Sequence, residues 1–423
     1  MGEHVGYLEL LRRNSEFRRL FAANWVSFLG DWFSIIALFI LSADQSDNSP
    51  LAIAAVLIFR MLGLALIEPF TGLLADRFSR RKLMLLSNFL SLIILLGFVQ
   101  FKLLDSLMMV YVMAFSMMFC RAIYDPAVYA YIPNITTKDE LLTANALGSL
   151  GWSAALGFGA ALGGFTIAAY GVNTSLLIDA VTFVVAYLLI WTLPEGGPSL
   201  EKKRGGGVRE VLGGVTEGWR IILNRPEIHR IIVAKGLWAV GGGAQIFLLI
   251  LIGAEGGFGA VAAGIGVLYM ARGFGSGVGP VLARWLWPDR RSWPFLIGGL
   301  VSLSGVFYIV VGLIEWTWWI IPCIFVSHAA SGANWVFSTT LIQERADDEW
   351  RGRAAGTDYL LMSVTSGTSS LMAALILEYG VLDLRQTLIL TASLQVVAGI
   401  LWLILGMPAE RRWAEDNAQL AAD

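Results

Sequence analysis

Long apolar runs alternate with short polar segments along the whole chain. Lipid offers no hydrogen-bond partners to backbone amides, so runs of about 20 apolar residues are expected to be helices rather than strands. The pattern therefore predicts an all-α integral membrane protein of twelve transmembrane helices. Their approximate ranges are 19–41, 51–74, 83–103, 106–131, 144–170, 174–193, 229–253, 258–285, 293–314, 316–341, 354–380 and 385–406.

Composition agrees with this pattern. Only 15% of the 423 residues are charged, against about 25% in soluble domains. The net charge of -2 argues against a nucleic-acid partner, and the partners expected are the lipid bilayer, protons and a small molecule. Cys120 and Cys323 both lie inside apolar runs, so neither a disulfide framework nor a metal centre is expected, and no cofactor is predicted.

Basic residues in the polar segments predict the orientation. If the N-terminus is cytoplasmic, nearly all lysines and arginines fall in cytoplasmic segments, and only Lys102 and Arg385 lie outside. Positive residues favour the cytoplasmic side. We therefore expect both termini in the cytoplasm of a cell whose inner membrane holds the protein as a multi-pass monomer. The first 20 residues do not resemble a removable signal peptide.

One long polar connection divides the chain. It predicts an N-terminal six-helix half at 1–194, a cytoplasmic linker at 195–228, and a C-terminal six-helix half with a cytoplasmic tail at 229–423. The later part of the linker is amphipathic, which predicts a helix lying on the membrane surface. Its apolar positions are Val211, Leu212, Val215, Trp219 and Ile222.

The two halves repeat each other. Residues 15–20 resemble 226–231, residues 72–77 resemble 279–284, and the segment after the fourth predicted helix resembles the one after the tenth. Because each half has an even number of spans, corresponding helices point the same way. Two parallel six-helix halves are a transporter architecture, with the binding cavity between them near the bilayer midplane.

A family resemblance rests on specific motifs. The sequence Gly-Leu-Leu-Ala-Asp-Arg-Phe-Ser-Arg-Arg-Lys at 72–82 is similar to the signature between helices two and three of the major facilitator superfamily, with Ser79 in place of its usual second glycine. Further motifs resemble the branch that contains macrolide efflux pumps and the enterobactin exporter. These lie at 30–33, 121–127, 131–133, 141–147 and 178–180.

Ionisable residues inside predicted spans are candidate sites because they are costly in a bilayer. Asp31, midway along the first span, is interpreted as a proton acceptor or a counter-charge for substrate; the alternative is a structural hydrogen-bond partner. Arg60 and Arg272 occupy equivalent spans of the two halves and are interpreted as an anion-binding pair or as structural partners of carboxylates.

Three further candidates lie inside predicted spans. Arg121 can pair with Asp125, four residues further along the same helix. Lys235 and His328 each have a structural alternative, because Lys235 can snorkel to the cytoplasmic face and His328 can be a packed hydrogen-bonding group. Glu68, Asp179, Asp358 and Glu378 lie closer to helix ends and are discounted.

The resemblance also implies a cytoplasmic gate. In this superfamily the carboxylate of helix four often joins the loop Asp and Arg in a charge network that closes the cytoplasmic side. In this sequence that network would comprise Asp76, Arg80 and Asp125, within a gate region that also includes Gly72, Arg77 and Arg81.

Glycines at helical spacing predict close helix packing. The pairs are Gly159 with Gly163 and Gly273 with Gly277. Residues 159–164 also resemble the glycine motif of antiporters, with Ala160 in place of its proline. Gly241, Gly242 and Gly243 are expected to weaken their helix locally and so to suit a gate.

These features predict a secondary active transporter that exports a small amphipathic compound, drug-like or siderophore-like, by alternating access and proton-coupled antiport. The alternatives are a lipid or lysolipid flippase of the same fold and a uniporter or importer. Direct use of ATP is not expected, because the sequence has no Walker phosphate-binding loop. An intramembrane enzyme is not expected either, because the three histidines lie in unrelated places.

Overall fold

The computed structural model describes the backbone at residues 5–195, 220, 223–346 and 351–420. The side chains of these residues are described too, except at 65–77, 138, 142, 351–353, 355 and 416–420.

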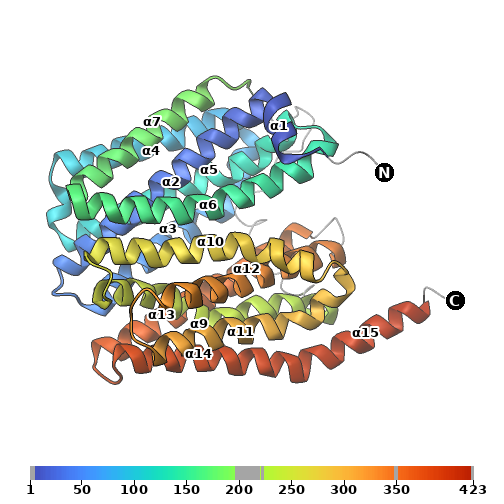
Figure 1. The fold of residues 1–423 in the computed structure, drawn as a ribbon. Coiled ribbons are helices and arrows are strands. Elements are labelled where there is room, and N and C mark those ends of the chain that lie inside the picture. The colour runs from blue at the N-terminus through green and yellow to red at the C-terminus, as the bar shows by residue number, and fades with distance from the viewer. Residues whose placement is uncertain (1–4, 196–219, 221–222, 347–350, 421–423) are drawn as a thin grey trace. The chain divides into compact units, whose positions relative to one another are not determined.

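The described residues form helices joined by short turns (Figure 1). The α-helices of the N-terminal part are α1 (Tyr7–Arg13), α2 (Ser15–Asp44), α3 (Pro50–Arg77), α4 (Arg80–Gln100), α5 (Leu107–Ile135), α6 (Lys138–Tyr170) and α7 (Val172–Trp191). Those of the C-terminal part are α9 (Pro226–Glu255), α10 (Val261–Leu286), α11 (Trp293–Leu313), α12 (Ile320–Arg345), α13 (Arg351–Glu378), α14 (Leu384–Leu401) and α15 (Met407–Leu420). A π-helical turn, η3 (Trp402–Gly406), joins the last two, and short 3-10 turns lie at Leu103–Asp105 and Arg290–Ser292.

Eleven helices in the described part are long and apolar enough to cross a membrane. A twelfth, α3, is 28 residues long, although its described apolar stretch is limited to Pro50–Leu64. The predicted ranges thus agree with the twelve long helices to within a few residues. The largest difference is at α6, which begins at Lys138 and not at 144. The α12 helix lies four residues later than predicted, at Ile320–Arg345 and not at 316–341. The predicted amphipathic linker positions lie outside the described residues.

Polar side chains define where several helices begin. Asn14 accepts a hydrogen bond from the backbone N–H of Phe17 through Oδ1 at 2.9 Å and so caps α2. Its Nδ2 also donates to the carbonyl of Ile135 at 2.7 Å and to Glu140 Oε2 at 3.2 Å. Glu140 in turn accepts from the backbone N–H of Thr137 at 3.0 Å, which fixes the start of α6. Side-chain capping of this kind satisfies backbone groups that the helix leaves unpaired.

The chain forms two compact units. The first comprises residues 1–211 with 259–270, and the second comprises 212–258 with 271–423. In the first unit α2 packs along α6 and α7, and α4 packs along α5 and α7. In the second unit α9 packs along α13 and α14, and α11 packs along α12 and α14. If the long helices of each half are numbered one to six, the first packs along the fifth and sixth in both units, and the third packs along the fourth and sixth. The sequence repeat predicts this correspondence.

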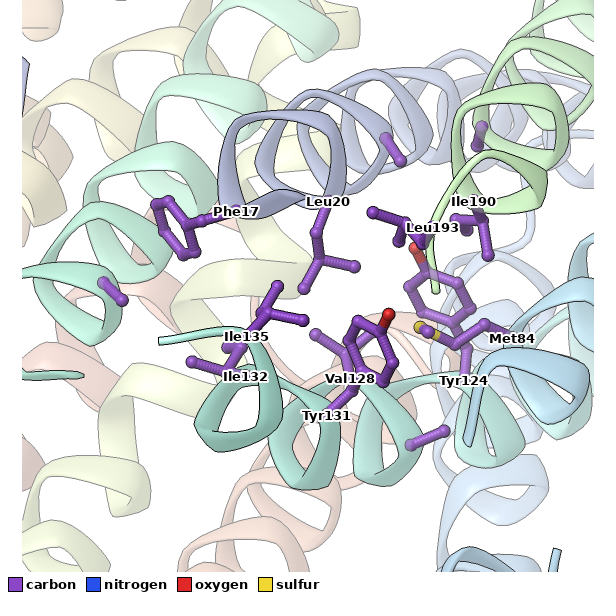
Figure 2. Packing of buried hydrophobic residues seen from close by; sticks show 14 of the residues in the cluster. Phe17, Leu20, Met84, Tyr124, Val128, Tyr131, Ile132, Ile135, Ile190 and Leu193 are labelled. Carbon is purple, nitrogen blue, oxygen red and sulfur yellow. The ribbon is translucent and has the colours of Figure 1, made fainter. Parts of the chain in front are cut away.

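One end of the first unit is filled by buried apolar side chains from five long helices, α2, α4, α5, α6 and α7 (Figure 2). Leu20 of α2, Met84 of α4, Val128 of α5 and Ile190 of α7 belong to this apolar cluster. Tyr131, also within it, has a hydroxyl that donates to the carbonyl of Pro194 at 2.7 Å.

Glycines allow the closest helix contacts. A Cβ added at Gly159 of α6 would lie 2.8 Å from the carbonyl oxygen of Leu29 on α2, and one added at Gly163 would lie 3.2 Å from that of Trp32. In the second unit Gly241 lies against Thr391 of α14, and Gly243 against Ser366 of α13. The α9 helix runs unbroken through residues 241–243, so the structure contains no local break there among the described residues. Within α10 the structure describes close contacts for Gly266, Gly275 and Gly279, the last two against α12. It describes none for Gly273 or Gly277, so the packing predicted for that pair stays a prediction.

Candidate functional site

A buried arginine joins two carboxylates in the first unit. Arg121 lies midway along α5, and its Nη1 is 3.1 Å from Oδ2 of Asp31 on α2. Its Nε is 2.9 Å from Oδ1 of Asp125, one turn further along α5. The four-residue spacing of Arg121 and Asp125 places both on one helical face, as expected. We call these three residues the charge cluster.

Aromatic rings hold the arginine in place. The guanidinium carbon of Arg121 lies 3.9 Å from the ring centre of Phe28 and 5.2 Å from that of Tyr124. Both distances are within the range of cation–π attraction. The hydroxyl of Tyr124 donates to Oδ1 of Asn24 at 2.5 Å, which fixes the orientation of that ring. The arginine is therefore positioned from several sides.

Exposure differs within the charge cluster. The side chain of Arg121 is 9% exposed, whereas those of Asp31 and Asp125 are 22% and 35% exposed. The two carboxylates are therefore less enclosed than the arginine that they contact. If one carboxylate takes up a proton, it loses its charge, and the arginine can pair fully with the other.

A small internal cavity of about 10 Å³ lies beside the charge cluster. The side chains around it are mostly polar and come from α2, α4, α5 and α7: Ser27, Asp31, Ser87, Asn88, Ser91, Met117, Arg121, Tyr124 and Phe183. Nη2 of Arg121 is buried and has no hydrogen-bond partner among the described residues. A polar cavity of this size is about large enough for one water molecule, which would satisfy that N–H group.

Two more charged residues surround the charge cluster. Arg60 of α3 lies within electrostatic range of Asp31, Arg121 and Asp179. Asp179 of α7 is fully buried, and it accepts hydrogen bonds from the hydroxyl of Ser34 and, at 3.1 Å, from that of Thr182. The first unit therefore contains two arginines and three carboxylates near one another, all on membrane-length helices.

The second unit has its own buried ion pair. Lys235 of α9 pairs with Oδ2 of Asp358 on α13 and donates to Oγ1 of Thr339 on α12 at 2.9 Å. Both charged side chains are buried. The ammonium of Lys235 therefore does not reach outward to a membrane surface, which is the alternative that the sequence leaves open for this residue.

His328 belongs to a packed hydrogen-bonded group in the second unit. Its Nε2 lies 2.8 Å from the hydroxyl of Tyr308 on α11, and its ring packs edge-on against that tyrosine. The charge of Arg272 acts on the same imidazole. The hydrogen-bonding contacts described for the His328 ring are those with Tyr308 and with the hydroxyl of Ser331, which lies 3.5 Å from Nδ1. This matches the packed role that is the alternative for His328.

The loop-signature residues hold helix ends together. Arg80 donates to the carbonyl of Ala130 at 2.7 Å and to Oδ1 of Asn134 at 2.6 Å, near the end of α5. Arg81 donates to the carbonyls of Ile190, at 3.3 Å, and Trp191, at the end of α7. The implied link from Arg80 to Asp125 is not present, because Asp125 pairs with Arg121. The side chains of Asp76 and Arg77, and the surroundings of Gly72, lie outside what the structure describes.

Two residues that the sequence interpretation discounts are buried in the structure. Asp179 and Asp358 are expected near helix ends, yet each lies two turns inside its helix. The sequence contains a pattern from which the role of Asp358 as the partner of Lys235 could have been predicted. Lys235 and Asp358 lie at similar distances from the starts of α9 and α13, and helices seven and eleven of a repeat run in the same direction. Their equal depth indicates that they can pair.

Comparisons with known proteins give the family. A model described as "Major Facilitator Superfamily" matches residues 20–370. An uncharacterized MFS-type transporter, YfiS of Bacillus subtilis (strain 168), is 28% identical over 185 residues, and the match spans 44% of this chain and 44% of that protein. The chain thus aligns with less than half the length of this relative.

Solved structures share the fold at low sequence identity. A mutant of a peptide transporter POT in complex with sulfate has a TM-score of 0.74 at 11% identity, covering 96% of this chain and 97% of that one. A mutant of the nucleoside transporter NupG has a TM-score of 0.70 at 10% identity, covering 92% and 99%. A bacterial homolog of the human lysosomal transporter Spinster, solved inward-facing and unoccupied, has a TM-score of 0.68 at 16% identity, covering 96% and 98%. At these identities the likeness concerns the fold alone.

Proposed function

Because the chain belongs to the major facilitator superfamily and is a multi-pass secondary transporter, we propose that it exports a small amphipathic compound in exchange for protons. The observation that carries this proposal is the charge cluster, in which one enclosed arginine serves two partly exposed carboxylates. Superfamily membership itself leaves the substrate, the direction and the coupling ion open.

Asp31 is the proposed coupling residue. It lies midway along α2, where an ionisable group is costly unless it has a function or a partner. Protonation removes its charge and loosens its contact with Arg121, and loss of the proton restores the ion pair. If substrate binding competes with protonation of Asp31, the two occupants exclude each other. Exchange of one for the other is antiport.

The loop after α3 is proposed to gate the cytoplasmic side. Supporting this, Arg80 and Arg81 fasten the start of α4 to the ends of α5 and α7. Alternating access is poised within a few kcal/mol, so modest contacts of this kind bias it. Asp76→Asn is expected to reduce transport while leaving the protein folded.

Within the superfamily we assign the chain to the macrolide-efflux and enterobactin-exporter branch, on the motifs at 121–127 and 141–147. Drug-like and siderophore-like compounds are therefore the first substrates to test. Erythromycin, enterobactin and lysophosphatidylcholine represent the drug, siderophore and lipid classes. Binding of each to the purified protein, measured as a rise in its unfolding temperature, selects among them.

The test of coupling uses proteoliposomes that contain the pH-sensitive dye pyranine. Adding a bound compound to protein-containing vesicles is expected to change the internal pH, and an imposed pH difference is expected to drive the compound against its own gradient. Transport that never exceeds equilibration, with no proton movement, would instead indicate a uniporter. Preference for lysophosphatidylcholine would favour the lipid transporter.

A further inference from the structure

The Lys235–Asp358 pair in the second unit takes no part in the coupling step proposed above. Two charges buried in this way lose their hydration, and replacing such a pair by apolar residues often leaves a protein no less stable. Ionisable residues inside membrane helices commonly mark the path of a substrate or ion. The surroundings of this pair show which kind of ligand it suits.

The ammonium of Lys235 has no free donor. A lysine ammonium has three N–H groups. Nζ contacts Oδ2 of Asp358, donates to Oγ1 of Thr339 at 2.9 Å, and lies 4.4 Å from the ring centre of Trp335. An anionic ligand would have to displace one of these contacts, so the lysine is not prepared to receive an anion.

The carboxylate of Asp358, in contrast, has an unused acceptor. Its Oδ1 atom is buried and has no hydrogen-bond partner among the side chains and backbone that the structure describes. A carboxylate oxygen offers two acceptor positions, and a buried acceptor is unfavourable until a donor satisfies it. The ligand that fits here carries an N–H or O–H donor.

Trp335 places an aromatic ring against the ammonium of Lys235. Its ring is 40% exposed, while Lys235 and Asp358 are buried. The face of an indole ring attracts cations, and aromatic rings recognise organic ammonium groups in this way. Lys235 already occupies this position as a tethered cation.

We propose that Asp358 and Trp335 form a binding subsite for the protonated amine of a lipophilic cationic substrate, and that Lys235 is the resident cation which that amine displaces. This inference rests on the proposed transport function and adds the substrate class. Displaced from Asp358, the lysine keeps Thr339 as a partner on α12. The pair thus keeps the subsite neutral when it is empty. When the amine pairs with Asp358, the subsite stays neutral because Lys235 gives up its proton to water and bonds Thr339 as a neutral amine.

A matched pair of dyes tests the proposal. Rhodamine 6G is a cationic xanthene with secondary amine N–H groups, and fluorescein is an anionic xanthene of similar size. Binding of each to the purified full chain in detergent is measured by fluorescence anisotropy, without any ion gradient. Rhodamine 6G is expected to bind at least tenfold more tightly than fluorescein. Asp358→Asn should remove most of that preference, and Lys235→Met should strengthen rhodamine binding several-fold by removing the competitor.

Folding controls keep the result interpretable. Lys235→Met leaves a carboxylate unpaired, so the double variant Lys235→Met with Asp358→Asn provides a neutral pair that should fold yet bind both dyes equally. Glu410→Gln removes a different buried carboxylate of the second unit, which pairs with Arg230 and Arg345, and should leave dye binding unchanged.

The subsite is rejected if Asp358→Asn, or the double variant, still prefers rhodamine 6G as the wild type does. It is also rejected if Lys235→Met binds rhodamine 6G no better than wild type. Because these measurements need no gradient, they separate failure of the subsite from failure of proton coupling. A protein that binds the cation as predicted but moves no protons would retain the subsite and lose the proposed antiport.

Discussion

Arg121 determines the balance of charge within the first unit. Its guanidinium forms separate contacts with carboxylates from two helices, and its remaining nitrogen lies beside a cavity about the size of a water molecule. A guanidinium can form such a forked contact because its donors lie in one plane, whereas a lysine ammonium offers a single point charge. Arginine is therefore better suited than lysine to serve Asp31 and Asp125 together.

Arg121→Gln is expected to destabilise the protein by less than the roughly 3–5 kcal/mol typical of a fully buried pair, because it leaves two partly exposed carboxylates without their counter-charge. Adding Asp31→Asn should recover part of that loss, since one of the two unpaired charges is then removed. Thermal unfolding of the purified variants in detergent measures both effects. Equal unfolding temperatures for Arg121→Gln and the wild type would show that the arginine does not stabilise the cluster.

The sequence is sufficient to single out Asp31 and Arg121, because charged residues stand out within apolar runs. It is not sufficient to show which groups they meet. Asp179 is reached by hydroxyls from α2 and from its own helix, a relation that depends on how α2 and α7 pack. The partner across a helix interface depends on rotation about each helix axis, which apolar run length does not give.

At the scale of single elements, helix contacts depend on side-chain size. Gly159→Leu is expected to destabilise the α2–α6 contact by about 1–3 kcal/mol, because the added atoms meet the Leu29 backbone and Trp32. Gly148→Ala on the same helix is the matched control: its added Cβ has no atom within 4 Å, so stability should be unchanged or slightly higher. Thermal unfolding compares the two, and a similar loss in both would argue against size as the cause.

The end of α7 provides a second test. Arg81 donates to two carbonyls there, so Arg81→Ala should loosen this end and increase the reactivity of a cysteine placed at the buried Leu193. Lys82→Ala is the control, because its 3.6 Å contact with Glu195 is exposed and should contribute little. The rate of labelling by a maleimide gives the comparison. Unchanged labelling in Arg81→Ala would mean that the apolar cluster alone holds this end.

Most elements follow directly from apolar run length, which is why the twelve long helices are predictable. Several helix boundaries and one short helix are not. The predicted start of α12 is too early because Trp316, Trp318 and Trp319 extend the apolar pattern into a turn that precedes the helix. The short α1 is absent from the prediction, since a seven-residue helix leaves little periodic signal.

At the scale of the whole molecule, the basic residues predict that both termini are cytoplasmic. Single cysteines at Asp105 and Tyr379 should react with an impermeant thiol reagent added to intact cells, whereas cysteines at Glu195 and Arg290 should react only after the cells are opened. Cys323 is replaced by serine beforehand, because it is partly exposed, while Cys120 is buried. Labelling of all four positions in intact cells would contradict the twelve-helix topology.

The central claim, that protonation of Asp31 couples proton flow to export, is tested most directly by Asp31→Asn in proteoliposomes. The measurement is accumulation, under an imposed pH difference, of the compound selected by the binding screen. The wild type is expected to concentrate the compound against its gradient. Asp31→Asn should lose this accumulation and keep downhill exchange, because an amide holds no exchangeable charge at this position. Accumulation by Asp31→Asn equal to that of the wild type would contradict the claim.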